Sequence, residues 1–104
     1  MAFWNLDVLK LEQFRPGIMS RAETGSNLIM VCMEISPGRE DSGHAHPFDQ
    51  CGIVIDGEIE MFVKGEHKIL KQNETYFIPS GERHGWKTME KGVKILDISL
   101  KQPQ

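Results

Sequence analysis

Apolar residues along this chain gather in short runs that are rich in β-branched and aromatic side chains. Turn-forming residues such as Gly, Pro, Asn and Asp separate these runs about every ten residues, a spacing typical of all-β sandwiches and barrels. Six runs predict strands: residues 28–35, 51–55, 59–63, 68–70, 75–78 and 93–100. We therefore expect an all-β fold.

Two turn signals predict how neighbouring strands connect. Asp56-Gly57 stands between two apolar runs and predicts a two-residue β-hairpin, because both residue types tolerate a positive φ. Gly65-Glu66 could close a second hairpin. Residues 6–14 show only a weak helical stripe, so this segment is interpreted as a helical turn or an edge strand.

Some predicted strands are apolar on both faces. Ile53 and Ile55 point to one face of their strand, while Val54 points to the other. In a small barrel the outward apolar face needs cover. A second sheet or another subunit could supply that cover, and the second option predicts a homodimer.

Length and charge limit the possible functions. A single domain, residues 1–104, is expected because a chain of 11.8 kDa has no room for a second core. The formal net charge of -3 and the scattered Lys and Arg residues argue against nucleic-acid binding. No apolar run approaches the roughly 20 residues needed to cross a bilayer, so no membrane partner is expected.

Two features predict a cytoplasmic protein. The start of the chain lacks the apolar core of a signal peptide. Cys32 and Cys51 have the spacing of neither a metal knuckle nor a redox pair, and both lie in apolar runs. We expect two buried free thiols, as is common in the reducing cytoplasm.

Three of the four histidines fall in two short patterned stretches, with a glutamine in the first. His44 and His46 stand two positions apart, so on an extended strand both rings point to one face. Gln50 follows in the same stretch, and His84 ends the second, after a Pro-x-Gly turn. Imidazole nitrogen and amide oxygen suit first-row divalent ions. The pattern predicts one divalent transition metal ion (Zn, Ni, Fe, Mn or Co) held by these four side chains.

The two stretches resemble the two motifs of the cupin superfamily, G-x5-H-x-H-x3-E-x6-G and G-x5-P-x-G-x2-H-x3-N. The matching residues are Gly38, His44, His46, Gly57, Pro79, Gly81 and His84. Gln50 stands at the glutamate position, Asn73 at the leading glycine of the second motif and Thr88 at its final asparagine. The resemblance implies a single-domain cupin, an all-β jelly-roll β-barrel (double-stranded β-helix). Residues 1–26 would form an N-terminal segment, and residues 28–100 the barrel core.

Gln50 is the informative departure from the motif. A glutamate would carry a charge and could accept a proton, whereas an amide does neither, so the ion would keep its dipositive charge and be a stronger Lewis acid. Affinity for hard ions should fall. Glutamine at this position resembles the pectin-degradation cupins that act on unsaturated uronates, which implies a non-oxidative rearrangement. The alternative is a site that has lost its metal.

The expected pocket holds several further candidates. Because the amide of Gln50 cannot transfer a proton, Asp49, Glu34 and Tyr76 are the candidates for that role, and Tyr76 is preferred. The predicted apolar wall consists of Met30, Phe48, Met61, Tyr76 and Trp86.

Two arginines could bind a substrate carboxylate through a bidentate fork. Arg83 is next to His84, and Arg21 lies in an early extended run. We assign Tyr76 and Arg83 as the candidate catalytic residues. His67 is interpreted as a solvated turn residue.

Three functions remain open. The preferred one is a metal-dependent isomerase or lyase acting on a small sugar acid or a keto/enol compound. The same ligands could instead hold iron in a cupin dioxygenase, or the chain could be a non-catalytic metabolite- or sugar-binding cupin. Each takes a small-molecule substrate or ligand, which can carry a carboxylate.

Overall fold

A computed structural model describes residues 2–101 of the chain. Within them lie ten strands: β1 (Glu12–Arg15), β2 (Ile18–Thr24), β3 (Leu28–Ile35), β4 (Glu40–His44), β5 (Gln50–Gly57), β6 (Ile59–Val63), β7 (Glu66–Leu70), β8 (Thr75–Ile78), β9 (His84–Lys87) and β10 (Val93–Leu100). The part of the chain that the structure describes contains no helix, and so none that could cross a membrane. The all-β prediction is confirmed.

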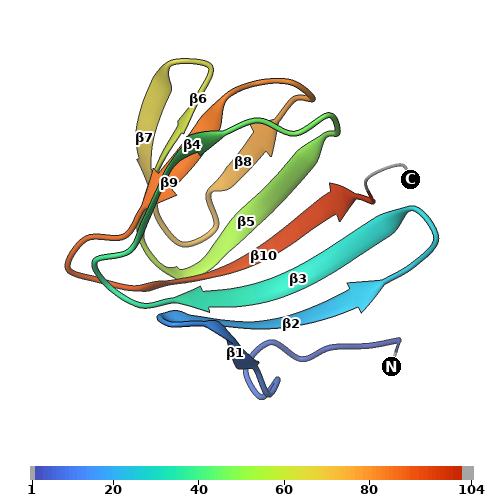
Figure 1. Ribbon diagram of the computed structural model, residues 1–104. Helices are drawn as coiled ribbons and strands as arrows, with labels where there is room; N and C mark the ends of the chain where they lie inside the picture. The colour runs from blue at the N-terminus through green and yellow to red at the C-terminus, as the bar shows by residue number, and fades with distance from the viewer. Residues whose placement is uncertain (1, 102–104) are drawn as a thin grey trace.

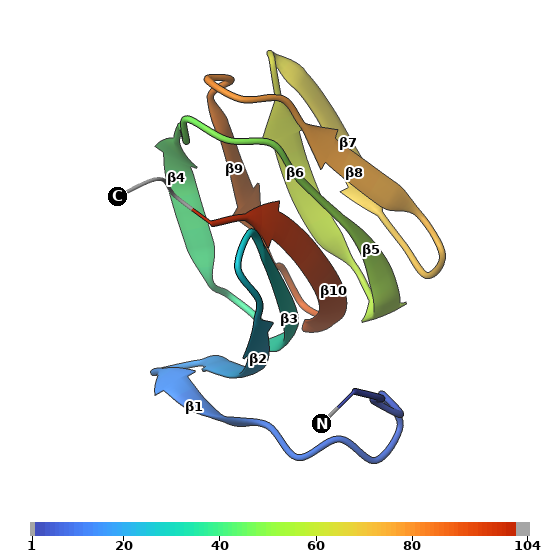
Figure 2. The ribbon, with the colours of Figure 1, turned by 90° about the vertical axis from the view of Figure 1, so that its right-hand side faces the viewer.

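The strands form two antiparallel sheets that face each other (Figures 1 and 2). One sheet has the order β1-β2-β3-β10-β5-β8 and the other the order β4-β9-β6-β7. Non-consecutive strands are neighbours in both sheets, which is the jelly-roll arrangement. Apolar side chains from both sheets meet between them, and Val54 of β5 and Ile59 of β6 are fully buried.

The predicted strands match the observed ones closely. The four runs 28–35, 59–63, 75–78 and 93–100 coincide with β3, β6, β8 and β10, and the other two lie within β5 and β7. Strands β2, β4 and β9 were not among the six predicted runs. The sequence of β4, EDSGH, is polar on both faces. Pairing with β9 makes it a strand, so tertiary contacts override a weak local preference there.

The hairpin predicted at Asp56-Gly57 is wrong. Strand β5 pairs with β10 and β8, whereas β6 pairs with β7 and β9, so this turn carries the chain from one sheet to the other. Gly57 has a φ of 80°, and a Cβ there would lie 2.1 Å from the carbonyl oxygen of Gly92. Glycine is therefore needed at this tight turn, where the chain passes from one sheet to the other. The second hairpin is confirmed between β6 and β7, with Lys64-Gly65 as its two-residue loop.

The two departures in the second motif have structural explanations. Asn73 has a φ of 70°, the left-handed conformation that glycine would adopt, and asparagine tolerates it better than most residues. Thr88 is buried, donates a hydrogen bond of 2.7 Å from its hydroxyl to Ser36 O, and accepts one of 3.0 Å from Arg39 N. Asn73 keeps the conformation of the turn at the start of the second motif, and Thr88 binds the end of that motif to the turn at residues 36–39.

The N-terminal region forms a turn and then an edge strand. Val8 N donates to Asn5 O in the turn, and β1 then pairs with β2 at the end of the six-stranded sheet. Lys94 of β10 donates a hydrogen bond to Leu6 O, which holds the segment against the outer face of that sheet. Both interpretations of residues 6–14 thus describe part of this segment.

The same outer face also carries a row of apolar residues. Met30, Ile98, Cys51 and Phe77 are cross-strand neighbours in one row, and Phe77 is 62% exposed. Both cysteines are free; Cys32 is buried, and Cys51 is only half-buried. A homodimer that covers this row stays a prediction, as does the single domain 1–104, of which residues 1 and 102–104 lie outside the described residues.

Candidate metal centre

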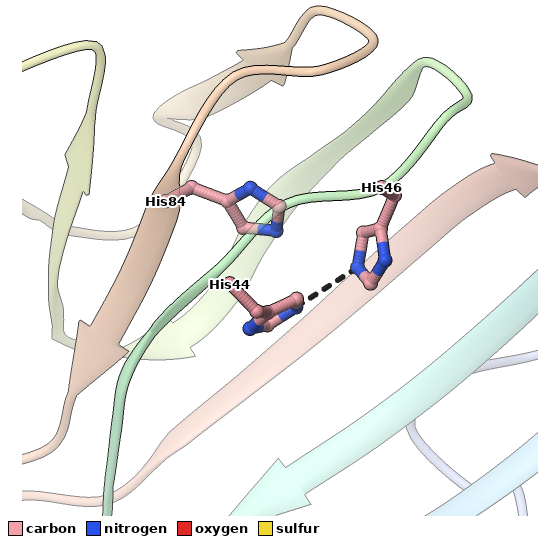
Figure 3. A group of neighbouring side chains, drawn as sticks. All are labelled: His44, His46 and His84. Atoms are coloured by element: carbon pink, nitrogen blue, oxygen red, sulfur yellow. Dashed lines mark hydrogen bonds between the residues drawn. The ribbon is translucent and has the colours of Figure 1, made fainter.

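Three histidine rings converge between the two sheets (Figure 3). His44 ends β4, His46 follows it by two residues, and His84 begins β9, which pairs with β4 so that His44 and His84 are directly opposite. One ring nitrogen from each histidine lies within 4.8 Å of the others, and the Nε2 atoms of His44 and His46 are 2.9 Å apart. A cation bound about 2.1 Å from each imidazole nitrogen fits such spacings.

Hydrogen bonds at Nδ1 orient two of the rings. His44 Nδ1 lies 3.0 Å from Asp41 Oδ2, and His84 Nδ1 donates to Glu82 O at 2.9 Å. These bonds leave Nε2 of both rings available to a metal ion, and such outer partners are a usual feature of metal-binding histidines. Burial opposes ionisation of Asp41, but the Gly43 N–H and the His44 ring outweigh it and lower the pKa of Asp41.

His46 is the third ring of the group. It stacks on Phe48, with ring centroids 4.7 Å apart and planes 7° from parallel. Burial, together with the neighbouring His44 and His84 rings, lowers the pKa of His46. The neutral imidazole, which is the form that binds a metal ion, is therefore favoured.

Gln50 supplies a fourth potential ligand. Its Nε2 donates a 2.9 Å hydrogen bond to Oδ2 of Asp97 on the adjacent strand β10. Its Oε1 is buried and has no hydrogen-bond partner among the described residues. A buried carbonyl oxygen without a partner is costly, and a bound cation would satisfy it. The residues present therefore fit a divalent ion held by His44, His46, His84 and Gln50.

Asp97 and Tyr76 form a buried pair beside Gln50. The Tyr76 hydroxyl donates a hydrogen bond to the same Oδ2 of Asp97. Burial raises the pKa of Asp97, although the hydrogen bonds from Tyr76 and Gln50 act in the opposite direction. Burial and the Asp97 charge both raise the pKa of Tyr76, so its hydroxyl keeps its proton.

The three histidines line a cavity of about 380 Å³ together with Gln50, Tyr76 and Asp97. This volume lies within the range of small-molecule sites. Of the predicted wall, Met61, Tyr76 and Trp86 line the cavity. Met30 does not, because it lies on the outer face of the six-stranded sheet opposite Ile98, and Phe48 contacts the site through His46.

The other sequence candidates lie outside the cavity lining. Arg83 is exposed, with its guanidinium against Gly43, and Arg21 is opposite Cys32 on the outer face. Asp49 accepts a hydrogen bond from Ser80 N, and Oε1 of Glu34 lies 4.0 Å from Nζ of Lys94. His67 is exposed on β7, as expected, although it belongs to a strand and stacks on Phe62.

Several residues of the cavity lining were not predicted from the sequence, among them Phe14, Arg15, Asp41 and Asp97. Asp97 carried a usable signal, because in the run VKILDISL it shares the alternation phase of Val93 and Ile95, both buried. An acidic residue in the inward phase of a strand indicates a buried carboxylate. Phe14 and Arg15 carried no such signal, since their place depends on how the N-terminal edge strand docks.

Comparison with known proteins agrees with this geometry. The sequence model of the cupin domain matches residues 31–99, most of the chain. The chain belongs to the cupin family. It is 33% identical over 88 residues to the pectin degradation protein KdgF of Dickeya dadantii (strain 3937), a match covering 83% of this chain and 80% of that protein.

Solved structures show the same fold. The structure of KdgF from Halomonas sp. superposes with a TM-score of 0.84 at 24% identity, covering 98% of this chain and 96% of that one. The polyketide cyclase RemF from Streptomyces resistomycificus gives a TM-score of 0.80 at 21% identity, covering 100% of this chain and 82% of that one. The jelly-roll cupin fold predicted from the two motifs is confirmed.

Proposed function

We propose that this cupin is a divalent-metal-dependent isomerase or lyase acting on a small sugar acid of the kind released when pectin is degraded. The observation that carries the proposal is that three converging histidine rings line the same cavity as Gln50, whose amide oxygen is buried and unpartnered. The similarity to pectin degradation protein KdgF over most of both chains supports the substrate class.

The ligand set supports non-oxidative chemistry. All four proposed ligands (His44, His46, His84 and Gln50) are neutral when they bind, so none of them offsets the charge of the ion. A divalent ion held there supplies Lewis-acid polarisation of a bound carbonyl or hydroxyl oxygen. Asp97 holds the amide nitrogen of Gln50 and thereby leaves its oxygen available for coordination.

The cavity also contains a proton source. Tyr76 keeps its proton at the hydroxyl oxygen, in a hydrogen bond to Asp97. We assign Tyr76 as the residue that donates a hydrogen bond or a proton to the substrate, because it lines the same cavity as the proposed ligands. The Tyr76 side chain is buried, so little water reaches that hydroxyl. A role for Arg83 stays a proposal that would need its exposed side chain to turn towards the cavity mouth.

Turnover of an unsaturated uronate tests the proposal directly. Metal-loaded protein should consume the compound, followed as loss of its ultraviolet absorbance, and His84→Ala should abolish the loss. His67→Ala is the matched control, because this histidine is exposed on β7, and it should retain full activity.

Three outcomes would contradict the proposal. Oxygen uptake with a diketone or catechol substrate, in place of uronate turnover, would support a dioxygenase. Binding of the uronate without turnover would support a metabolite-binding cupin. Equal activity in the wild type and His84→Ala would show that the histidine cluster is not the reaction centre.

A further inference from the structure

The N-terminal edge strand brings a cation and an aromatic ring to the metal-site cavity. Phe14 and Arg15 of β1 line the same cavity as the three histidines, although they are more than 25 positions away from His44 in the sequence. Both side chains are exposed, and Phe14 is 63% exposed, which places them at the mouth of the cavity. The guanidinium carbon of Arg15 lies 5.4 Å from the centre of the Phe14 ring.

A β-bulge explains how two consecutive residues face one cavity. In a regular strand Phe14 and Arg15 would point to opposite faces. The register of β1 against β2 shifts between Gln13, which pairs with Met19, and Arg15, which pairs with Ile18. Phe14 is therefore the extra residue of the bulge. Bulges commonly re-aim a side chain next to a functional site.

Arg15 differs from the other three arginines of the chain. The guanidinium of Arg39 donates to Pro16 O, that of Arg83 lies against Gly43, and Arg21 is on the outer face of the six-stranded sheet. Among residues 2–101, Arg15 has no carboxylate partner, and its guanidinium lies over the Phe14 ring. Its fork of N–H donors is available, and the ring limits the rotamers that the long side chain explores.

We propose that Arg15, supported by Phe14, binds the carboxylate of an anionic ligand whose hydroxyl or carbonyl end reaches the histidine cluster. The guanidinium of Arg15 lies at the mouth of the cavity of about 380 Å³, and the histidine ligands proposed for the cation lie inside it. A molecule that carries a carboxylate at one end and oxygen donors at the other spans both groups. The proposal rests on the proposed function, because it names the Arg15 guanidinium as the group that distinguishes a sugar acid from a neutral sugar.

A matched pair of ligands tests this assignment separately from turnover. D-galacturonate and D-galactose share a ring and differ in the carboxylate, so calorimetric titration of metal-loaded protein measures the contribution of that group. The wild type should bind galacturonate more tightly than galactose. Arg15→Gln should lower galacturonate affinity by about tenfold or more, since hydrogen bonds to charged groups are the stronger ones, and should leave galactose affinity unchanged.

Two control variants complete the experiment. Arg21→Gln removes an equal charge on the outer face and should bind galacturonate like the wild type. Arg15→Lys keeps the charge without the bidentate fork and should recover only part of the lost affinity. Equal affinity of Arg15→Gln and Arg21→Gln for galacturonate, or no preference of the wild type for galacturonate, would overturn the assignment. Absence of uronate turnover together with Arg15-dependent binding would refute the proposed reaction and leave this anion site standing.

Discussion

The Tyr76 hydroxyl of β8 donates a hydrogen bond to Asp97 of β10, although strand β5 lies between them. The bond passes over Gly52 of β5, which has no side chain to block it. Gly52 of β5 pairs with Tyr76 of β8 on one side and with Asp97 of β10 on the other. A Cβ on this glycine would lie 2.3 Å from the Tyr76 hydroxyl oxygen. The hydroxyl and the carboxylate can therefore bond only because the residue between them has no side chain. The same carboxylate holds Gln50, so this glycine contributes to the order of the candidate metal site.

Gly52→Ala should destabilise the protein by about 1–3 kcal/mol, the range for inserting a methyl group into a packed core. The new Cβ would also lie 2.7 Å from Leu96 O, so backbone as well as side chain must move. Urea denaturation measures the change. Gly25→Ala is the control, because a Cβ there meets only Leu28 O at 3.7 Å, and it should change stability by less than about 0.5 kcal/mol. Equal effects of the two substitutions would contradict the packing described here.

Asp97 should matter for metal binding although it is not a proposed ligand. Asp97→Ala removes the acceptor that holds Gln50 Nε2, so the amide can rotate, and metal affinity should fall by about tenfold to hundredfold. Tyr76→Phe removes the neighbouring hydroxyl and keeps the Gln50 bond, so affinity should stay within about twofold. Competition with a chromophoric chelator gives both values. A loss in Tyr76→Phe as large as that in Asp97→Ala would show that the effect is general loosening of the core.

Asp41 should orient His44 in the same way from the opposite side of the site. Asp41→Ala removes the 3.0 Å contact with Nδ1, which allows the ring to turn and the wrong nitrogen to carry the proton. We expect metal affinity to fall by about tenfold to hundredfold. Glu40→Gln changes the charge of the adjacent exposed residue and should leave affinity unaltered. If both variants weaken binding equally, the cause is the loss of negative charge near the site and not the orientation of His44.

Gln50→Glu should have opposite effects on the protein with and without metal. A carboxylate ligand strengthens binding of a hard ion, so manganese affinity should rise by about tenfold. Without metal, the same change places a carboxylate against Asp97 and removes the donor of the 2.9 Å bond, which should lower the urea midpoint. Gln72→Glu in an exposed turn is the control for both measurements. Unchanged manganese affinity would show that Gln50 is not a ligand.

The sequence predicted what short-range spacing determines. Local patterns predicted most of the strands, the two-residue spacing of His44 and His46, and the position of His84 after a Pro-x-Gly turn. The structure brings these three rings together. Asn73 shows that a departure from a motif can preserve its conformation, since it adopts the φ of 70° that a glycine would take.

Features that depend on long-range pairing were not predictable in the same way. The turn at Asp56-Gly57 has the composition of a hairpin, but composition does not say whether the flanking strands pair, and here they belong to different sheets. Arg15 reaches the cavity because β1 docks on β2 with a bulge, a contact to which no local pattern points. Asp97 is an intermediate case. Its inward direction could be predicted from the alternation along β10, but its partners Gln50 and Tyr76 could not, because they lie on other strands.

Metal stoichiometry tests the central claim most directly. Purified protein dialysed against zinc, nickel or manganese should retain about one ion per chain by elemental analysis, and the His67→Ala variant should retain the same amount. His84→Ala should retain far less, since it removes one of three rings whose nitrogens lie within 4.8 Å of one another. A wild-type protein that retains none of these ions, or a His84→Ala variant that retains as much as the wild type, would contradict the account.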